Sequence, residues 1–272
     1  MSLRGCTACL TIIWLITGSL CADTSLSPSD LKRITYDQHL GQQLSRSLVF
    51  RDSNKKSVSL GDLFNDKPTL LILGYYHCPM LCTLINDGLI ESLQELRFDV
   101  GRDFNIIDLS IDPNETPEIA TAKKREYLKR YGRPKAESAW HFLTGDEGAI
   151  AQLTNEVGFR FKYDLATHEY AHPSGFVVLA PGGRISRYFF GVNFNPDELR
   201  SAIIAAGNGQ KGSLIKELIL LCCRYSPVTG KYGELVLTVL RVLGVSTVVL
   251  MAWWILILAR AGAARNRSQE AG

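Results

Sequence analysis

Two cysteines, Cys78 and Cys82, are the residues of this sequence best suited to do chemistry, and three residues separate them. The apolar run from Pro68 to Leu73 predicts a buried strand before them, and the leucine and isoleucine spacing over 81–96 predicts a helix after them. Pro79 favours a helix start immediately after Cys78, where the helix dipole would favour a thiolate. The pattern therefore predicts a reactive pair at a strand-to-helix junction rather than two packed core cysteines.

The spacing of this pair favours metal binding over a disulfide. Helix positions four apart have Cβ atoms roughly 5–6 Å apart, whereas a relaxed disulfide needs Cβ atoms about 3.5–4.5 Å apart. Two thiolates on one helical face suit a soft metal ion without distorting the turn. Because two sulfurs leave such an ion under-coordinated, we expect a nitrogen ligand from another segment.

Histidines are the candidates for that nitrogen ligand. The five in the chain are His39, His77, His141, His168 and His172. His77 adjoins Cys78 but should point away from it along an extended approach, and His141 lies in a predicted strand, where a core role is more usual. His172 lies in a turn-rich loop directly before a predicted strand, at the sheet end where the cysteines emerge. We favour His172, with His168 in the same loop as the alternative, although spacing alone leaves the choice open.

The elements that must position these residues alternate between strands and helices. Besides the strand before the cysteines, the pattern predicts a hairpin at 48–60, a strand at 104–111, a helix at 117–131, a strand at 140–143, a helix at 146–157, a half-buried strand at 159–163, a hairpin at 176–189 and a helix at 196–205. This order describes an α/β sandwich. A cysteine pair after its central strand makes the pattern thioredoxin-like.

The first residues of the chain predict a signal peptide. Arg4 gives the positive start, and Cys9 to Leu20 form an uncharged, largely apolar run that is short for a membrane span. Small residues near Ala22 favour cleavage there over lipidation at Cys21. We therefore expect residues 1–22 to be removed from the mature protein.

The other end of the chain predicts a transmembrane helix. Residues 242–259 carry no charge, and two tryptophans in this run suit a membrane interface. The span is expected within residues 235–260. Arg260, Arg265 and Arg267 follow the uncharged run closely, as expected for a cytoplasmic tail at 261–272.

These segments together predict a single-pass protein of the cytoplasmic membrane, with its folded domain on the periplasmic side. Cys222 and Cys223 lie in an apolar stretch, where packing near the bilayer is favoured over a second metal site. A net charge of +3, without a basic patch interleaved with aromatics, argues against nucleic acid as a partner. The expected segments are a signal peptide at 1–22, an exposed leader at 23–45, a thioredoxin-like domain at 46–206, a juxtamembrane linker at 207–234, a transmembrane helix at 235–260 and a cytoplasmic tail at 261–272.

Four blocks of the domain resemble the Sco/SenC family. They are His77-Cys78-Pro79-Met80-Leu81-Cys82, then Ser110-Ile111-Asp112-Pro113 with Glu115-Thr116-Pro117, then Trp140-His141-Phe142-Leu143-Thr144-Gly145, and then His172 followed nine residues later by Pro181-Gly182-Gly183. The blocks appear in family order. The resemblance implies a thioredoxin fold and a copper chaperone that helps to assemble the dinuclear copper centre of cytochrome c oxidase. Its implied partners are the oxidase subunit that carries this centre and a copper donor protein.

The resemblance also implies the residues of the copper site. The ligands of the copper ion correspond to Cys78, Cys82 and His172, and an acidic residue near the site corresponds to Asp112. A cap on the strand end before the following proline is an equally good role for Asp112. Because Pro173 follows the histidine, a cis His172–Pro173 bond is a further hypothesis.

A second function stays open alongside copper delivery. Cys78 and Cys82 could be the catalytic redox pair of a thiol-disulfide oxidoreductase that reduces the cysteines of the oxidase copper site. Three intervening residues, rather than the two of the common redox motif, count against efficient cycling. Zinc is a further alternative for the metal, but a structural zinc site normally closes with four ligands and only three are identified.

Overall fold

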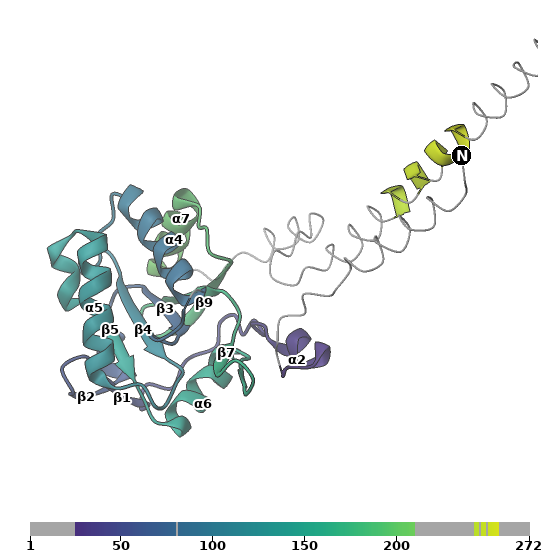
Figure 1. Cartoon of the computed structure of the whole chain (residues 1–272). Helices are drawn as coiled ribbons and strands as arrows, with labels where there is room; N and C mark the ends of the chain where they lie inside the picture. The colour runs from purple at the N-terminus through teal and green to yellow at the C-terminus, as the bar shows by residue number, and fades with distance from the viewer. Residues whose placement is uncertain (1–24, 80, 210–241, 245, 249, 256–272) are drawn as a thin grey trace, which may run out of the picture. The chain divides into compact units, whose positions relative to one another are not determined.

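The computed structural model describes residues 25–79, 81–209, 242–244, 246–248 and 250–255 (Figure 1). The chain divides into two units, Met1–Ser213 and Leu214–Gly272. The described residues of the second unit are helical. No helix among the described residues is both long and apolar enough to cross a bilayer.

Several predicted segments fall wholly or partly outside these ranges. The signal peptide at 1–22 and the tail at 261–272 lie outside them, as do Cys222 and Cys223. The predicted span at 235–260 is described only in part. These segments remain predictions from the sequence.

The first unit alternates strands and helices as the sequence predicts. In chain order the elements are α2 (Pro28–Arg33), β1 (Val49–Asp52), β2 (Ser57–Ser59), α3 (Leu60–Leu63), β3 (Thr69–Gly74), α4 (Leu81–Glu95), β4 (Asn105–Ser110), α5 (Pro117–Tyr131), the 3-10 helix η1 (Pro134–Ser138), β5 (Trp140–Thr144), α6 (Glu147–Val157), β6 (Lys162–Asp164), β7 (Glu169–Ala171), β8 (Gly175–Ala180), β9 (Arg184–Phe190) and α7 (Pro196–Gly207).

Seven strands form the main sheet, in the order β2-β1-β5-β4-β3-β8-β9. β3, β4 and β5 run parallel at its centre, and β8 and β9 add an antiparallel hairpin beside β3. Strands β6 and β7 form a separate two-stranded sheet. This mixed α/β arrangement is thioredoxin-like, which confirms the predicted fold class of the domain.

Both faces of the central sheet are buried, which is why β3 reads as a continuous apolar run. Leu70 and Ile72 face one cluster with α4, α5 and α7. Leu71 and Leu73 face a second cluster with α3, α6 and the segment before β1. Helices therefore cover the two faces of the sheet (Figure 1), and β3 lies inside it, between β4 and β8.

The described part of the segment predicted as an exposed leader packs on the domain instead. Leu26, Tyr36 and Leu44 are buried. Tyr36 forms a bridge with Phe159, so part of the predicted half-buried strand at 159–163 pairs here. The expectation of an exposed segment was wrong because these apolar side chains are spaced too widely to form a recognisable pattern.

Candidate metal centre

The loop that follows β3 holds Cys78, and the start of α4 holds Cys82. We call residues 75–79 the cysteine loop. α4 spans Leu81–Glu95 and Pro79 lies outside it, so the predicted start directly after Cys78 was too early, but Cys82 lies in the opening turns as expected. A Cβ atom on Gly74 would lie 2.9 Å from Cys82 Sγ, so only glycine allows this close approach.

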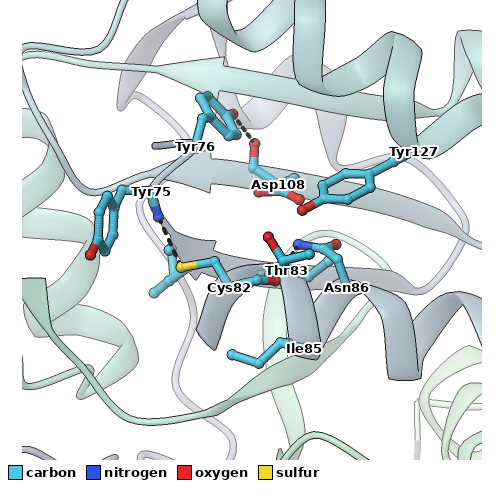
Figure 2. Close-up of a pocket in the computed structure, with 11 residues that line it drawn as sticks. Tyr75, Tyr76, Cys82, Thr83, Ile85, Asn86, Asp108 and Tyr127 are labelled. Atoms are coloured by element: carbon cyan, nitrogen blue, oxygen red, sulfur yellow. Dashed lines mark hydrogen bonds between the residues drawn. The ribbon is translucent and has the colours of Figure 1, made fainter. Parts of the chain in front are cut away.

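Backbone N–H groups point at both sulfurs. Cys78 Sγ accepts from Cys82 N at 3.3 Å. Cys82 Sγ accepts from Tyr75 N at 3.4 Å, and Figure 2 shows this second bond. Both side chains are buried thiols rather than a disulfide. The hydrogen bond with Cys78, together with burial, raises the pKa of the Cys82 thiol well above its usual value. A metal ion must therefore displace a proton from Cys82 when it binds.

The small two-stranded sheet positions His172, which directly follows β7, beside the cysteines. We call residues 162–172, which include β6 and β7, the histidine hairpin. His172 Nε2 lies 3.1 Å from Cys82 Sγ, and His172 Nδ1 lies 3.0 Å from the carbonyl oxygen of Pro173. Because a carbonyl can only accept, Nδ1 carries the hydrogen and Nε2 presents a lone pair. This is the tautomer that a metal ligand through Nε2 requires.

The ligand atoms of Cys78, Cys82 and His172 all lie within 4.8 Å of one another, and all three residues are buried. A single ion could contact all three, and a site of two thiols and one imidazole suits copper. The predicted alternative, His168, is exposed and lies against Tyr163 instead. His141 is half-buried on β5, and burial lowers its pKa to about 4.

The His172–Pro173 bond is trans, because the described residues contain no cis peptide bond. The cis hypothesis was therefore wrong. It rested on the position of Pro173 and on the cis proline common in thioredoxin-like folds, whereas the trans form is the usual state of such bonds in folded proteins. The predicted turn-rich loop before Pro173 also contains an unforeseen strand, β7.

Aromatic rings surround the imidazole of His172. Tyr75 meets it edge-on at 6.0 Å between ring centroids, and Phe159 lies at 5.8 Å. Tyr170 packs against Tyr75 at 5.4 Å and links the histidine hairpin to the cysteine loop. These rings hold the imidazole in place and keep most water away from its buried side.

Asp112 lies near the site but does not join it. Its Oδ1 accepts from the backbone and side-chain nitrogens of Asn114 at 2.9 and 3.0 Å. Tyr170 donates to the same oxygen at 3.4 Å. The carboxylate therefore caps the turn after β4, and its bond with Tyr170 links it to the histidine hairpin.

Glu115, a residue that the sequence analysis did not single out, hydrogen-bonds the backbone of the cysteine loop. Its side chain is 1% exposed. It accepts from the backbone nitrogens of Tyr76 and His77, both at 2.7 Å, from His77 Nδ1 at 3.0 Å and from Ser110 Oγ. The available signal was an acidic residue in a polar block after a core strand. Nothing in the sequence indicated that its partners lie 38 and 39 residues earlier.

A second missed residue, Asp108, lies behind Cys82 on β4. Figure 2 shows Asp108, Asn86 and Cys82 around a small buried cavity. Burial raises the pKa of Asp108 to about 7. Within the described part of the chain, Asp108 Oδ2 and Asn86 Oδ1 have no hydrogen-bond partner. The buried side of the cysteine site is therefore lined in part by the polar side chains of Asp108 and Asn86.

The fold and the site define a class: a thioredoxin-like α/β protein with two thiols and one imidazole gathered at the end of its central strand. The family model described as SCO1/SenC matches residues 37–206, and the chain belongs to this family. None of the curated proteins matches the chain.

Solved structures of similar fold also match the chain. A protein of Aquifex aeolicus VF5 whose name refers to electron transfer is 28% identical, with a TM-score of 0.54, and the match covers 63% of this chain and 95% of that chain. A second Aquifex aeolicus VF5 structure, named for electron transport, is 28% identical with a TM-score of 0.51 and coverages of 63% and 99%. A SCO1/SenC family lipoprotein from Bacillus anthracis str. Ames shares the fold at 16% identity, with a TM-score of 0.50 and coverages of 62% and 97%.

Proposed function

We propose that the chain binds one copper ion through Cys78, Cys82 and His172 and delivers it to the dinuclear copper centre of cytochrome c oxidase. The observation that carries this proposal is the buried group of two thiols and one imidazole nitrogen within 4.8 Å. Membership of the SCO1/SenC family supports copper as the cargo. Thiolates suit cuprous copper, and imidazole also accepts the cupric ion.

The three ligands Cys78, Cys82 and His172 explain how the chain could both hold a copper ion and release it. Three protein ligands leave a copper ion open to attack by a further thiolate. Cysteines of a receiving protein can replace Cys78 and Cys82 one at a time, so transfer needs only ligand exchange. Each thiol that binds the ion loses a proton, and it regains one when the ion leaves.

The proposed place of action is the outer face of the cytoplasmic membrane. The uncharged run at 242–259 supports a membrane helix within 235–260, and the apolar start of the chain supports export of the domain. Together they would hold the domain on the periplasmic side. The proposed partners there are the copper-site subunit of the oxidase and a copper donor protein.

The second candidate function is thiol-disulfide exchange with the cysteines of the oxidase copper site. The observation in its favour is that Cys78 and Cys82 are both thiols and lie within one group of 4.8 Å. His172 separates the two functions, since a thiol exchange reaction does not need its imidazole. In His172→Ala, copper affinity should fall steeply while thiol exchange largely persists.

Anaerobic titration of the reduced full chain with cuprous copper tests the proposal. Wild type should bind one ion, and Cys78→Ser and Cys82→Ser should each lose this binding. His172→Ala should bind at least about 100-fold more weakly, beyond the loss typical of residues that only orient a ligand. His168→Ala is the matched control and should behave as wild type. Equal stoichiometry and affinity in all the variants would contradict the copper assignment.

A further inference from the structure

His77 is an exposed imidazole directly beside one of the proposed ligands. Its side chain is 68% exposed, whereas Cys78 next to it is 9% exposed. It lies outside the group formed by Cys78, Cys82 and His172. His77 is therefore an exposed neighbour in the chain of a buried ligand, and it is not itself part of the buried group.

The bonds of His77 fix which of its nitrogens is available. Glu115 Oε1 lies 3.0 Å from His77 Nδ1 and also accepts from the backbone nitrogen of His77 at 2.7 Å. An ionised carboxylate only accepts hydrogen bonds, so Nδ1 carries the hydrogen. Nε2 is then the nitrogen with a lone pair when the ring is neutral.

Metal-binding histidines in other proteins commonly make the same kind of bond as His77 makes with Glu115. Such a histidine usually donates its second ring N–H to a carboxylate or a carbonyl, which sets its tautomer and raises its basicity. Within the described residues, His77 is the exposed histidine whose ring is held by a buried carboxylate. If the imidazole of His77 served only to hydrogen-bond Glu115, its exposure to solvent would have no purpose.

We propose that His77 Nε2 is a transient copper ligand, through which the ion enters and leaves the site of Cys78, Cys82 and His172. This inference rests on the proposed copper function. During uptake, a bond from copper to His77 Nε2 forms first, and Cys78 then binds the same ion. The bond to His77 breaks as Cys82 and His172 bind. The copper oxidation state does not change, and the thiol protons pass to solvent.

Stopped-flow kinetics on the reduced full chain test this role. The protein is mixed anaerobically with cuprous copper held by bicinchoninate, and the return of copper to excess bicinchoninate is followed separately. His77→Ala should slow both steps by about ten-fold, equivalent to about 1.4 kcal/mol of activation free energy. The copper affinity should stay within about two-fold of wild type, since a ligand used only in passage changes both rates equally.

Two further variants separate a ligand from a structural residue. A methionine thioether binds cuprous copper but cannot donate to Glu115. His77→Met should therefore recover most of the lost rate, and the exposed control His168→Ala should keep the wild-type rates. Unchanged rates in His77→Ala, or rates in His77→Met as slow as in His77→Ala, would overturn the role of His77 alone. A wild-type chain that takes up no copper would overturn the proposed copper function as well.

Discussion

The cysteine loop and the histidine hairpin supply ligands to the same group, but the rest of the fold holds them very differently. The cysteine loop continues from the central strand β3 and is bonded to the buried carboxylate of Glu115. The histidine hairpin belongs to a separate two-stranded sheet, and Leu165 at its tip is 73% exposed.

The hairpin is attached to the fold by fewer buried groups. Asp164 Oδ1 accepts from the backbone nitrogen of Ser25 at 3.0 Å. An exposed ion pair between Lys162 and Asp30 adds a second link to the segment before β1. Elements with few buried contacts open at lower free energy than core strands. We therefore expect the cysteines to be the fixed half of the site and His172 to be the half that adjusts.

Loss of the Glu115 carboxylate should have the largest effect on stability, because it removes the support of the fixed half. In Glu115→Gln, the amide can no longer accept all of the bonds from Tyr76, His77 and Ser110. We expect the free energy of unfolding to fall by about 3 kcal/mol, since buried bonds to a charged group are costly to lose. Denaturant unfolding of the reduced, copper-free chain measures this.

The matched control for Glu115 is Asp112→Asn, which changes the half-buried carboxylate that caps the same turn. Its loss should change stability by about 0.5 kcal/mol, as is usual for surface positions. Equal effects of the two substitutions would mean that Glu115 does not anchor the cysteine loop.

Asp108→Asn should change how stability depends on pH. Burial raises the pKa of Asp108 to about 7 from an ordinary value of 3.8. A raised folded-state pKa of a carboxyl group gives stability below about pH 4 that is lost as the pH rises through about 7. Because asparagine does not ionise, the variant should gain stability relative to wild type between pH 4 and pH 8. A pKa difference of one corresponds to about 1.4 kcal/mol, so the gain should be easily measured.

Denaturant unfolding of the copper-free Asp108→Asn chain at several pH values tests this. The control is Asp112→Asn, whose carboxylate lies outside the cavity. A difference between wild type and Asp108→Asn that stays constant from pH 4 to pH 8 would show that Asp108 is not a buried carboxyl group behind the fixed half.

Apart from the control substitution, Ser25→Ala should have the smallest effect, and this effect should be confined to the adjusting half. The substitution removes the hydroxyl that donates to Asp164 and leaves the backbone bond in place. We expect a loss of about 1 kcal/mol, the usual contribution of one hydrogen bond. Hydrogen exchange should become faster in the histidine hairpin and stay unchanged in β3. Faster exchange in both regions would contradict the independence of the two halves.

Much of the fold follows from local sequence patterns. The apolar run of β3, the helical spacing of α4 and the turn between β8 and β9 are all visible in the sequence, and these elements were predicted correctly. The buried leader residues Leu26 and Tyr36 were not, because isolated apolar residues carry no periodicity. β7 was missed because a strand of three residues inside a polar loop is too short to show alternation.

The candidate site was predictable in part for similar reasons. Cys78 and Cys82 are close in sequence, so their spacing alone indicated chemistry. His172 is 90 residues away from Cys82, and spacing left its choice over His168 open; the resemblance to Sco/SenC proteins made the difference. Glu115 and Asp108 were missed because their roles depend on burial and on distant partners, which no local pattern encodes.

The most direct test of the central claim is X-ray absorption spectroscopy of the copper-loaded full chain. The account predicts a copper ion bound by two sulfurs and at least one imidazole nitrogen, with the imidazole signal reduced in His172→Ala and unchanged in His168→Ala. Copper bound without sulfur ligands, or an unchanged imidazole signal in His172→Ala, would contradict it.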